Sequence, residues 1–96
     1  MLARIAATTA RLHASGDPAV TLANATVYLE AVGHAVVAWI WLDQRLAVGD
    51  LAGAFYDGKR HATRYFFRWE LPKVTVQLDL LDSLDTTLLD MPDEAF

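Results

Sequence analysis

The residues that could carry chemistry are few, and one group of them lies in the middle of the chain. The stretch GHAVVAWIWL, residues 33–42, places His34 and two tryptophans in an otherwise aliphatic run. Glu30 stands four residues before His34, one helical turn away, where a carboxylate and an imidazole can pair. The familiar metal site of helical bundles needs Glu-x-x-His on two helices. Here the step is four residues long and occurs once, so we predict a surface or interface pair and no metal site.

Other catalytic signatures are missing from the sequence. The chain has no cysteine, which removes thiolate catalysis, zinc–thiolate sites and disulfides together. It has no Gly-x-Ser-x-Gly or Ser-x-x-Lys motif, and its five glycines form neither Gly-x-Gly-x-x-Gly nor a P-loop. We therefore predict no catalytic, cofactor-binding or metal-ligating residue in this chain.

Three arginines form a second group of interest. Arg60, Arg64 and Arg68 follow one another at four-residue steps, which aligns them along one side of a helix. They could hold a phosphate or the carboxylates of a partner, although a solvated surface or pairing with the acidic C-terminal segment is the simpler interpretation. The aromatic residues among them, Tyr65–Phe67 and Trp69, predict packing in a core or a subunit interface.

A long central helix must position the first group. Asp17 followed by Pro18 is typical of a helix start, with an N-cap and a proline at the first helical position. We predict a helix of about 30 residues from Pro18 to Val48, more than twice the average globular length. Gly49 can adopt the left-handed backbone that ends helices.

Helices are predicted on both sides of this central one. Apolar residues at three-four spacing indicate a first helix that begins at Leu2 and stops at Gly16. Residues 54–84 have helical periodicity, with a kink or a junction of two helices expected at Pro72. The predicted fold class is all-α: an antiparallel helical bundle of three long helices, the third kinked near Pro72, plus a short C-terminal segment from residue 85.

The central helix has two usable sides when each residue is turned by 100°. One side carries Leu22, Leu29, Gly33, Val36 and Ile40, with Trp39 at its flank, and the other carries Val27, Glu30, His34, Ala38, Trp41 and Arg45. We expect the first side and Trp39 to face the domain's own core. The second side mixes aromatic and charged residues, as interfaces do, so the predicted interface residues are Glu30, His34, Trp41 and Arg45. Mid-helix Gly33 costs about 1 kcal/mol relative to alanine, which makes sense if another helix approaches there.

Composition narrows the class of protein. Ninety-six residues predict one domain spanning 1–96, and an apolar fraction of 54% suggests a surface that a partner covers. The uncharged run 31–42 has twelve residues, below the roughly 18 needed for a membrane span. A net charge of −4 argues against nucleic-acid binding. No secretory signal is evident at the N-terminus, so we expect a cytoplasmic protein.

The order of these features resembles the C-terminal helical domain that follows the catalytic body in one branch of the acyl-CoA dehydrogenase family. The match runs from about Ala23 through ANATVYLEAVGHAVVAWIWLDQ and FYDGKRHATRYFFRWELPKV to LLDMPDEAF. The residues that carry it are Tyr28, Leu29, Gly33 and Trp39, then Gly58, Lys59, Ala62, Tyr65–Phe67, Leu71 and Pro72, then Met91, Pro92 and Phe96. All of them are packing residues, with no chemical signature among them.

The resemblance implies that this chain is the C-terminal piece of a larger flavoprotein. Such parents bind FAD and dehydrogenate acyl-CoA thioesters with a carboxylate base in the main domain. Neither that base nor the flavin-binding segments have a counterpart here, so no catalytic or cofactor residue is carried over. We expect a non-catalytic domain that packs on the catalytic body or a neighbouring subunit and supports a homodimer or higher homo-oligomer, without contact to nucleic acid or membrane.

Two other functions remain open at this point. The chain could be an independent helical module that recognises a partner helix with the same side of its central helix. It could instead bind an anionic ligand such as the phosphates of CoA through Arg60, Arg64 and Arg68.

Overall fold

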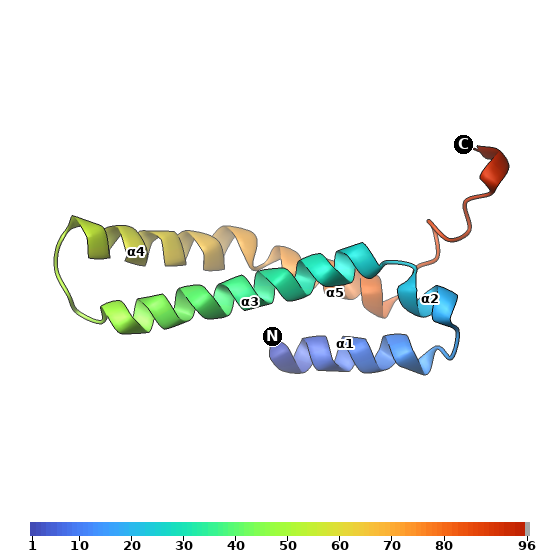
Figure 1. Ribbon diagram of the computed structural model, residues 1–96, viewed down its shortest axis with the longest axis horizontal. Helices are drawn as coiled ribbons and strands as arrows, with labels where there is room; N and C mark the ends of the chain where they lie inside the picture. The colour runs from blue at the N-terminus through green and yellow to red at the C-terminus, as the bar shows by residue number, and fades with distance from the viewer. Residues whose placement is uncertain (96) are drawn as a thin grey trace.

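The computed structural model describes residues 1–95, and helices are the only regular structure in that range. Figure 1 shows their order along the chain. The elements are α1 (Leu2–Ala14), α2 (Pro18–Leu22), α3 (Ala25–Val48), α4 (Ala54–Tyr65), the π-helix η1 (Phe66–Glu70), α5 (Lys73–Asp82) and the 3-10 helix η2 (Asp93–Ala95). The predicted all-α class is confirmed. Phe96, part of the predicted terminal motif, lies outside the described residues.

The helices form an elongated slab around α3. One half of α3 pairs with the antiparallel α4, and the other half packs on α5, which also contacts α1 (Figure 1). The slab measures 59 × 30 × 14 Å, with a radius of gyration of 17.7 Å. A compact domain of this length has a radius of gyration near 12.5 Å. The arrangement is therefore too extended to cover α3 on all sides.

The central helix is shorter than predicted, because the segment from Pro18 to Val48 forms two helices. Asp17 caps the first as expected, accepting a hydrogen bond from the Ala19 N–H at 3.0 Å. The chain leaves helical geometry at Asn24, whose φ is −121° and ψ is 38°. Its side chain donates a hydrogen bond to the Asp85 carbonyl at 2.8 Å. The prediction of one continuous helix is wrong because this tertiary contact holds Asn24 out of the helix.

The interruption at Pro72 is confirmed and has an additional feature. The Leu71 N–H donates to the Phe66 carbonyl at 2.9 Å, a five-residue step that defines the wider turn of η1. Proline lacks an N–H, and its ring collides with the carbonyl four residues back in a regular helix. The wide turn of η1 lies directly before Pro72 and accommodates that ring, and α5 then begins at Lys73.

The core lies at one end of the slab, where α1, α3 and α5 meet. Its buried members are Leu12, Ala31, Val74, Leu78 and Leu81. Tyr28 borders this cluster and shares a hydrogen bond of 2.8 Å between its hydroxyl and that of Thr9. The largest fully buried side chains come from α5, so α5 is the element on which α1 and α3 are assembled.

An ion pair fastens α1 to α5 beside this core. Arg4 contacts Asp79 at 2.5 Å and Asp82 at 3.0 Å. The pKa of Asp82 lies below its ordinary value, first because the nearby polar hydroxyl of Thr8 favours the ionised carboxylate and further because of Arg4, which hydrogen-bonds to it. The folded state therefore favours the ionised carboxylate.

We expect Asp82→Asn to flatten the acid limb of the stability profile. A lowered folded-state pKa contributes stability that is fully present above the ordinary aspartate pKa of about 4 and is lost as pH falls through the folded-state value. The pair is partly exposed, so the loss near pH 7 should stay within about 1 kcal/mol. Urea unfolding between pH 2 and 7 measures it, with exposed Asp50→Asn as the control. Equal profiles for both variants would contradict this role of Asp82.

Candidate functional site

Three of the four predicted interface residues of α3 contact other helices of the same chain. Glu30 accepts a hydrogen bond from the Gln77 amide at 3.1 Å. The His34 Nε2 is 3.7 Å from the Glu70 Oε2, and its ring stacks on Phe66 with centroids 6.1 Å apart. Both residues therefore hold α3 to η1 and α5.

Further along α3, Trp41 contacts α4, whereas Arg45 bonds to the end of its own helix. The Lys59 ammonium of α4 sits over the Trp41 ring, 5.7 Å from its centroid. Arg45 donates to the Gly49 carbonyl at 3.2 Å, just beyond the helix end. Gly49 has a φ of +52°, which confirms the predicted helix stop. Contact of these four residues with another subunit stays a prediction, since their observed partners belong to this chain.

Glu70 is the charged centre of this inner surface. The Lys73 ammonium donates to the Glu70 carboxylate at 3.1 Å. This hydrogen bond is the main cause that lowers the pKa of Glu70, and His34 adds to it. The carboxylate therefore stays ionised, and its contacts are those of a structural ion pair between neighbouring helices.

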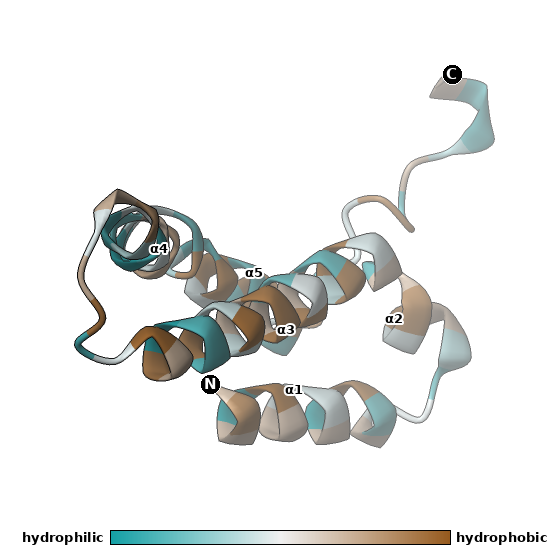
Figure 2. Cartoon of the chain, turned by 60° about the vertical axis from the view of Figure 1, so that its left-hand side comes forward, coloured by the Kyte–Doolittle hydropathy of each residue, from teal (hydrophilic) through white to brown (hydrophobic). Residues whose placement is uncertain are grey.

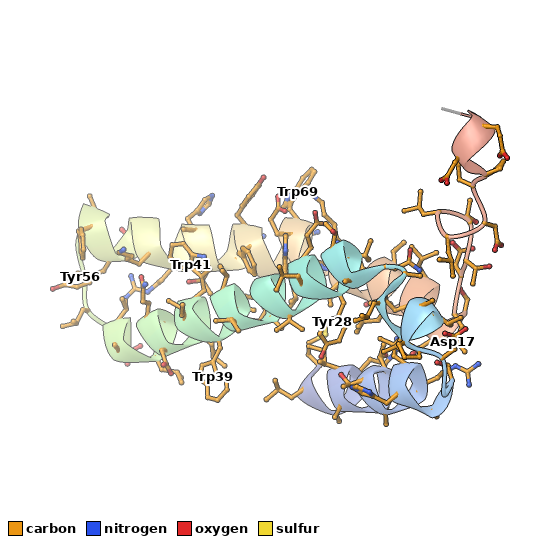
Figure 3. The ribbon with its side chains drawn as sticks, turned by 45° about the vertical axis from the view of Figure 1, so that its right-hand side comes forward. Asp17, Tyr28, Trp39, Trp41, Tyr56 and Trp69 are labelled. Carbon is orange, nitrogen blue, oxygen red and sulfur yellow. The ribbon has the colours of Figure 1, made fainter. Side chains whose placement is uncertain are left out.

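The prediction that Trp39 belongs to the domain's own core is wrong. Trp39 is 57% exposed, and it points away from α4 whereas Trp41 lies between α3 and α4 (Figure 3). The two tryptophans do point to opposite sides, as predicted, but the inner and outer sides are exchanged. The side of α3 that is buried carries Ala31, Ala35 and Ala38. Small side chains let neighbouring helices approach, and this alanine spacing is the signal that sequence reasoning overlooked.

The exposed side of α3 forms a continuous apolar strip, which we call the outer stripe: Leu29, Gly33, Val36 and Ile40. Leu29 is 71% exposed and Ile40 51%. The residues are separated by four, three and four positions, the spacing of a helix–helix seam. A Cβ added at Gly33 would meet nothing within 4 Å. The outer stripe is therefore open along its length, and Figure 2 shows the apolar colouring of α3.

A second uncovered apolar surface is a hollow of about 290 Å³ that Trp39 borders. It is bordered by α1, α3, η1 and the turn before α5, and its lining residues are Met1, Leu2, Ala35, Ala38, Trp39, Leu42, Phe67 and Leu71. The hollow extends the uncovered apolar surface from α3 toward the start of α1. A partner that covers the stripe could also fill this hollow.

The length and composition of α3 also suffice for a membrane span. An 18-residue window in it has a mean hydropathy of 1.4, and only 17% of that window is buried within the chain. A helix covered by protein on both sides has the same composition. Glu30 and His34 bind neighbouring helices from within this segment, which fits a helix packed in protein.

The three aligned arginines separate in the structure. Arg60 donates to Asp57 at 2.8 Å, to the Gly49 carbonyl at 3.2 Å and to the Leu51 carbonyl. It therefore closes the loop between α3 and α4 and is not free for a ligand. On an α-helix, residues four apart point in directions that differ by 40°. Arg60 and Arg68, two such steps apart, therefore point in directions that differ by about 80°.

Arg64 and Arg68 remain exposed and line a surface hollow of about 430 Å³, which we call the arginine hollow. Its other lining residues are His61, Tyr65 and Trp69. The Tyr65 and Trp69 rings stack with centroids 6.1 Å apart and planes inclined by 17°. Within residues 1–95, neither arginine forms an ion pair. The hollow combines two uncommitted cations with an exposed aromatic shelf.

These surfaces define the class of the chain: an elongated all-helical domain with two uncovered patches. Across residues 1–95, no three His, Asp or Glu side chains gather as a metal site would require. A family model described as "Acetyl-CoA dehydrogenase C-terminal like" matches residues 1–92. The chain therefore belongs to this family of C-terminal domains of acyl-CoA dehydrogenases, as its sequence suggested. No curated protein and no solved structure matches the chain.

Adjacent substitutions test which side of α3 is internal. Ala38 is 6% exposed, so Ala38→Glu should cost about 3 kcal/mol or more by burying an unpaired charge in a close-packed contact. Trp39→Glu, one residue later, should change the free energy of unfolding of the monomer by less than about 1 kcal/mol. Urea denaturation at low protein concentration measures both. The reverse order would place Trp39 in the core after all.

Proposed function

We propose that this chain is the C-terminal packing domain of an FAD-dependent acyl-CoA dehydrogenase-like oxidoreductase and stabilises the assembled enzyme without joining its chemistry. The observation that supports this most directly is the outer stripe. A soluble domain rarely leaves a helix apolar nearly all round and open to water. We infer that the catalytic body or a neighbouring subunit covers the stripe in the complete enzyme.

The surface area of the chain supports a large partner contact. Its accessible surface is 6711 Å². A compact monomer of 10.6 kDa exposes about 5500 Å². The excess is about 1200 Å², and a standard interface buries about 800 Å² on each side. A single interface of that size along α3 would remove about two-thirds of the excess.

The geometry of the outer stripe favours a helix as the covering element. Seam spacing lets the side chains of a second helix fit between those of the first. Gly33 lies in the middle of the stripe, where the absence of a side chain permits close approach of another backbone. In a homo-oligomer, the α3 helix of a neighbouring subunit offers the same spacing and can meet it across a two-fold axis.

The chemistry belongs outside this chain in the proposed function. The arginine hollow is open, since its five lining residues are all exposed, and an enclosed flavin needs a cleft that buries most of its surface. The described residues do not fit FAD, and we derive no reaction step from them. FAD, the acyl-CoA substrate and the catalytic base are assigned to the body of the enzyme.

A charge in the outer stripe tests the packing function. We expect the chain to self-associate, as light scattering would show, and Ile40→Glu to shift it to monomer because a buried unpaired charge is costly. The matched control is Val76→Glu, which places the same charge on an exposed valine of α5, away from the stripe. A compact monomer at high concentration without any substitution would contradict self-association through this surface.

Gly33→Leu should have opposite effects on the monomer and the assembly. Leucine replaces glycine in an exposed helix interior with open space around it, so the monomer should gain about 0.5 to 1 kcal/mol. The same side chain should push a docked helix away and weaken association about tenfold or more, or at least 1.4 kcal/mol. Thermal unfolding and sedimentation equilibrium separate the two effects. Unchanged or tighter association would show that no backbone approaches Gly33.

A further inference from the structure

We propose that the arginine hollow binds the acidic tail, residues 85–95, of a second copy of this chain. The proposal concerns a different surface from the outer stripe and does not depend on it. It gives a function to two features that the packing domain leaves unexplained: a pair of free arginines and a free apolar–acidic segment.

The arginine hollow has the properties of a peptide-binding surface. Trp69 is 66% exposed and stacked on Tyr65, and Figure 3 shows it on the side of η1 away from α3. Exposed aromatic rings beside arginines are typical of interface anchors. A guanidinium binds a carboxylate through two parallel hydrogen bonds, so Arg64 and Arg68 can each hold one acidic side chain.

The acidic tail has matching chemistry, and after its first residues, where Asn24 contacts the Asp85 carbonyl, residues 87–95 are exposed. It leaves the end of the slab near α2 and projects away from the helices (Figures 1 and 2). Its apolar residues Leu88, Leu89 and Met91 are all exposed, Leu88 by 72%. Asp93 and Glu94 follow them, and neither forms an ion pair or a side-chain hydrogen bond among residues 1–95.

Charge is distributed unevenly between the helical body, residues 1–84, and the acidic tail. Four of the twelve acidic residues and none of the eight basic ones lie after Leu84, so residues 1–84 carry equal numbers of each. The net charge of −4 therefore resides in the last twelve residues. In the docked state the leucines would rest on the Tyr65–Trp69 shelf, and the carboxylates would pair with Arg64 and Arg68.

The tail is internally ordered in a way that suits docking. Asp85 accepts hydrogen bonds from the N–H and hydroxyl of Thr87, and Thr86 donates to Asp90 at 2.6 Å. These local bonds shape the segment before it meets a partner, which lowers the entropy lost on binding. Because the tail points away from the body of its own chain, the hollow it can enter without turning back belongs to a second copy.

A labelled peptide of residues 85–95, with an amidated end, tests the contact by fluorescence anisotropy. The receptor is the full chain carrying Asp93→Asn and Glu94→Gln, so that its own tail does not compete. We expect saturable binding that weakens about tenfold or more in a receptor that also carries Arg64→Glu and Arg68→Glu. The control substitution Val76→Glu adds a charge at an exposed position outside the hollow and should leave binding unchanged.

Charge exchange makes the test specific. A peptide with Asp93→Lys and Glu94→Lys should bind the Arg64→Glu, Arg68→Glu receptor better than the natural peptide does. Ile40→Glu in the outer stripe should leave peptide binding intact. Light scattering therefore tests the packing function, and anisotropy tests this proposal independently. No saturable binding up to about 1 mM, near the weak limit of specific recognition, or equal binding to both receptors, would overturn the proposal.

Cysteine cross-linking identifies which copy supplies the tail. The chain has no cysteine of its own, so a His61→Cys chain mixed with a Glu94→Cys chain should oxidise to a dimer joined by one disulfide. Replacing His61→Cys by Asp50→Cys, in a loop away from the hollow, should abolish that product. If a chain carrying both His61→Cys and Glu94→Cys instead forms an internal disulfide at high dilution, the tail occupies its own hollow and the second copy is excluded.

Discussion

The structure depends on one constraint: α3 is apolar nearly all round, and the chain has too few helices to surround it. One half of α3 packs on α5, and the other half packs on α4 and η1. What remains is the outer stripe. The extended shape, the large surface area and the exposed tryptophan all follow from this shortage of covering elements. The proposed partner contact would supply the missing cover.

Local chemistry made parts of the fold predictable. The cap of Asp17 with Pro18, the helix stop at Gly49 and the interruption at Pro72 each depend on a residue whose backbone preferences are strong. The break at Asn24 was not predictable in the same way. It depends on a hydrogen bond to the carbonyl of Asp85, 61 residues along the chain, and no local pattern indicates such a partner.

The surfaces were harder to predict than the helices. The outer side of α3 is the more apolar of the two, so hydrophobicity alone indicated the wrong side as internal. The decision rests on size: alanines face the neighbouring helices, and Leu29, Val36, Trp39 and Ile40 face outward. Arg60 was grouped with Arg64 and Arg68 by spacing, but the nearby carbonyl groups of the α3–α4 loop bind it first. Sequence spacing identifies which residues share a direction and not which of them already have partners.

The uneven placement of large buried side chains has a consequence for dynamics. Leu12, Val74, Leu78 and Leu81 gather at one end of the slab, whereas the far part of the α3–α4 hairpin buries Ala38, Val48 and Thr63. Smaller buried side chains hold a contact less strongly, so the hairpin tip opens at lower free energy than the rest and its amide protons exchange with solvent first. The end of the domain with the large buried side chains is therefore the more rigid one, and the α3–α4 hairpin tip is the part whose conformation changes most easily.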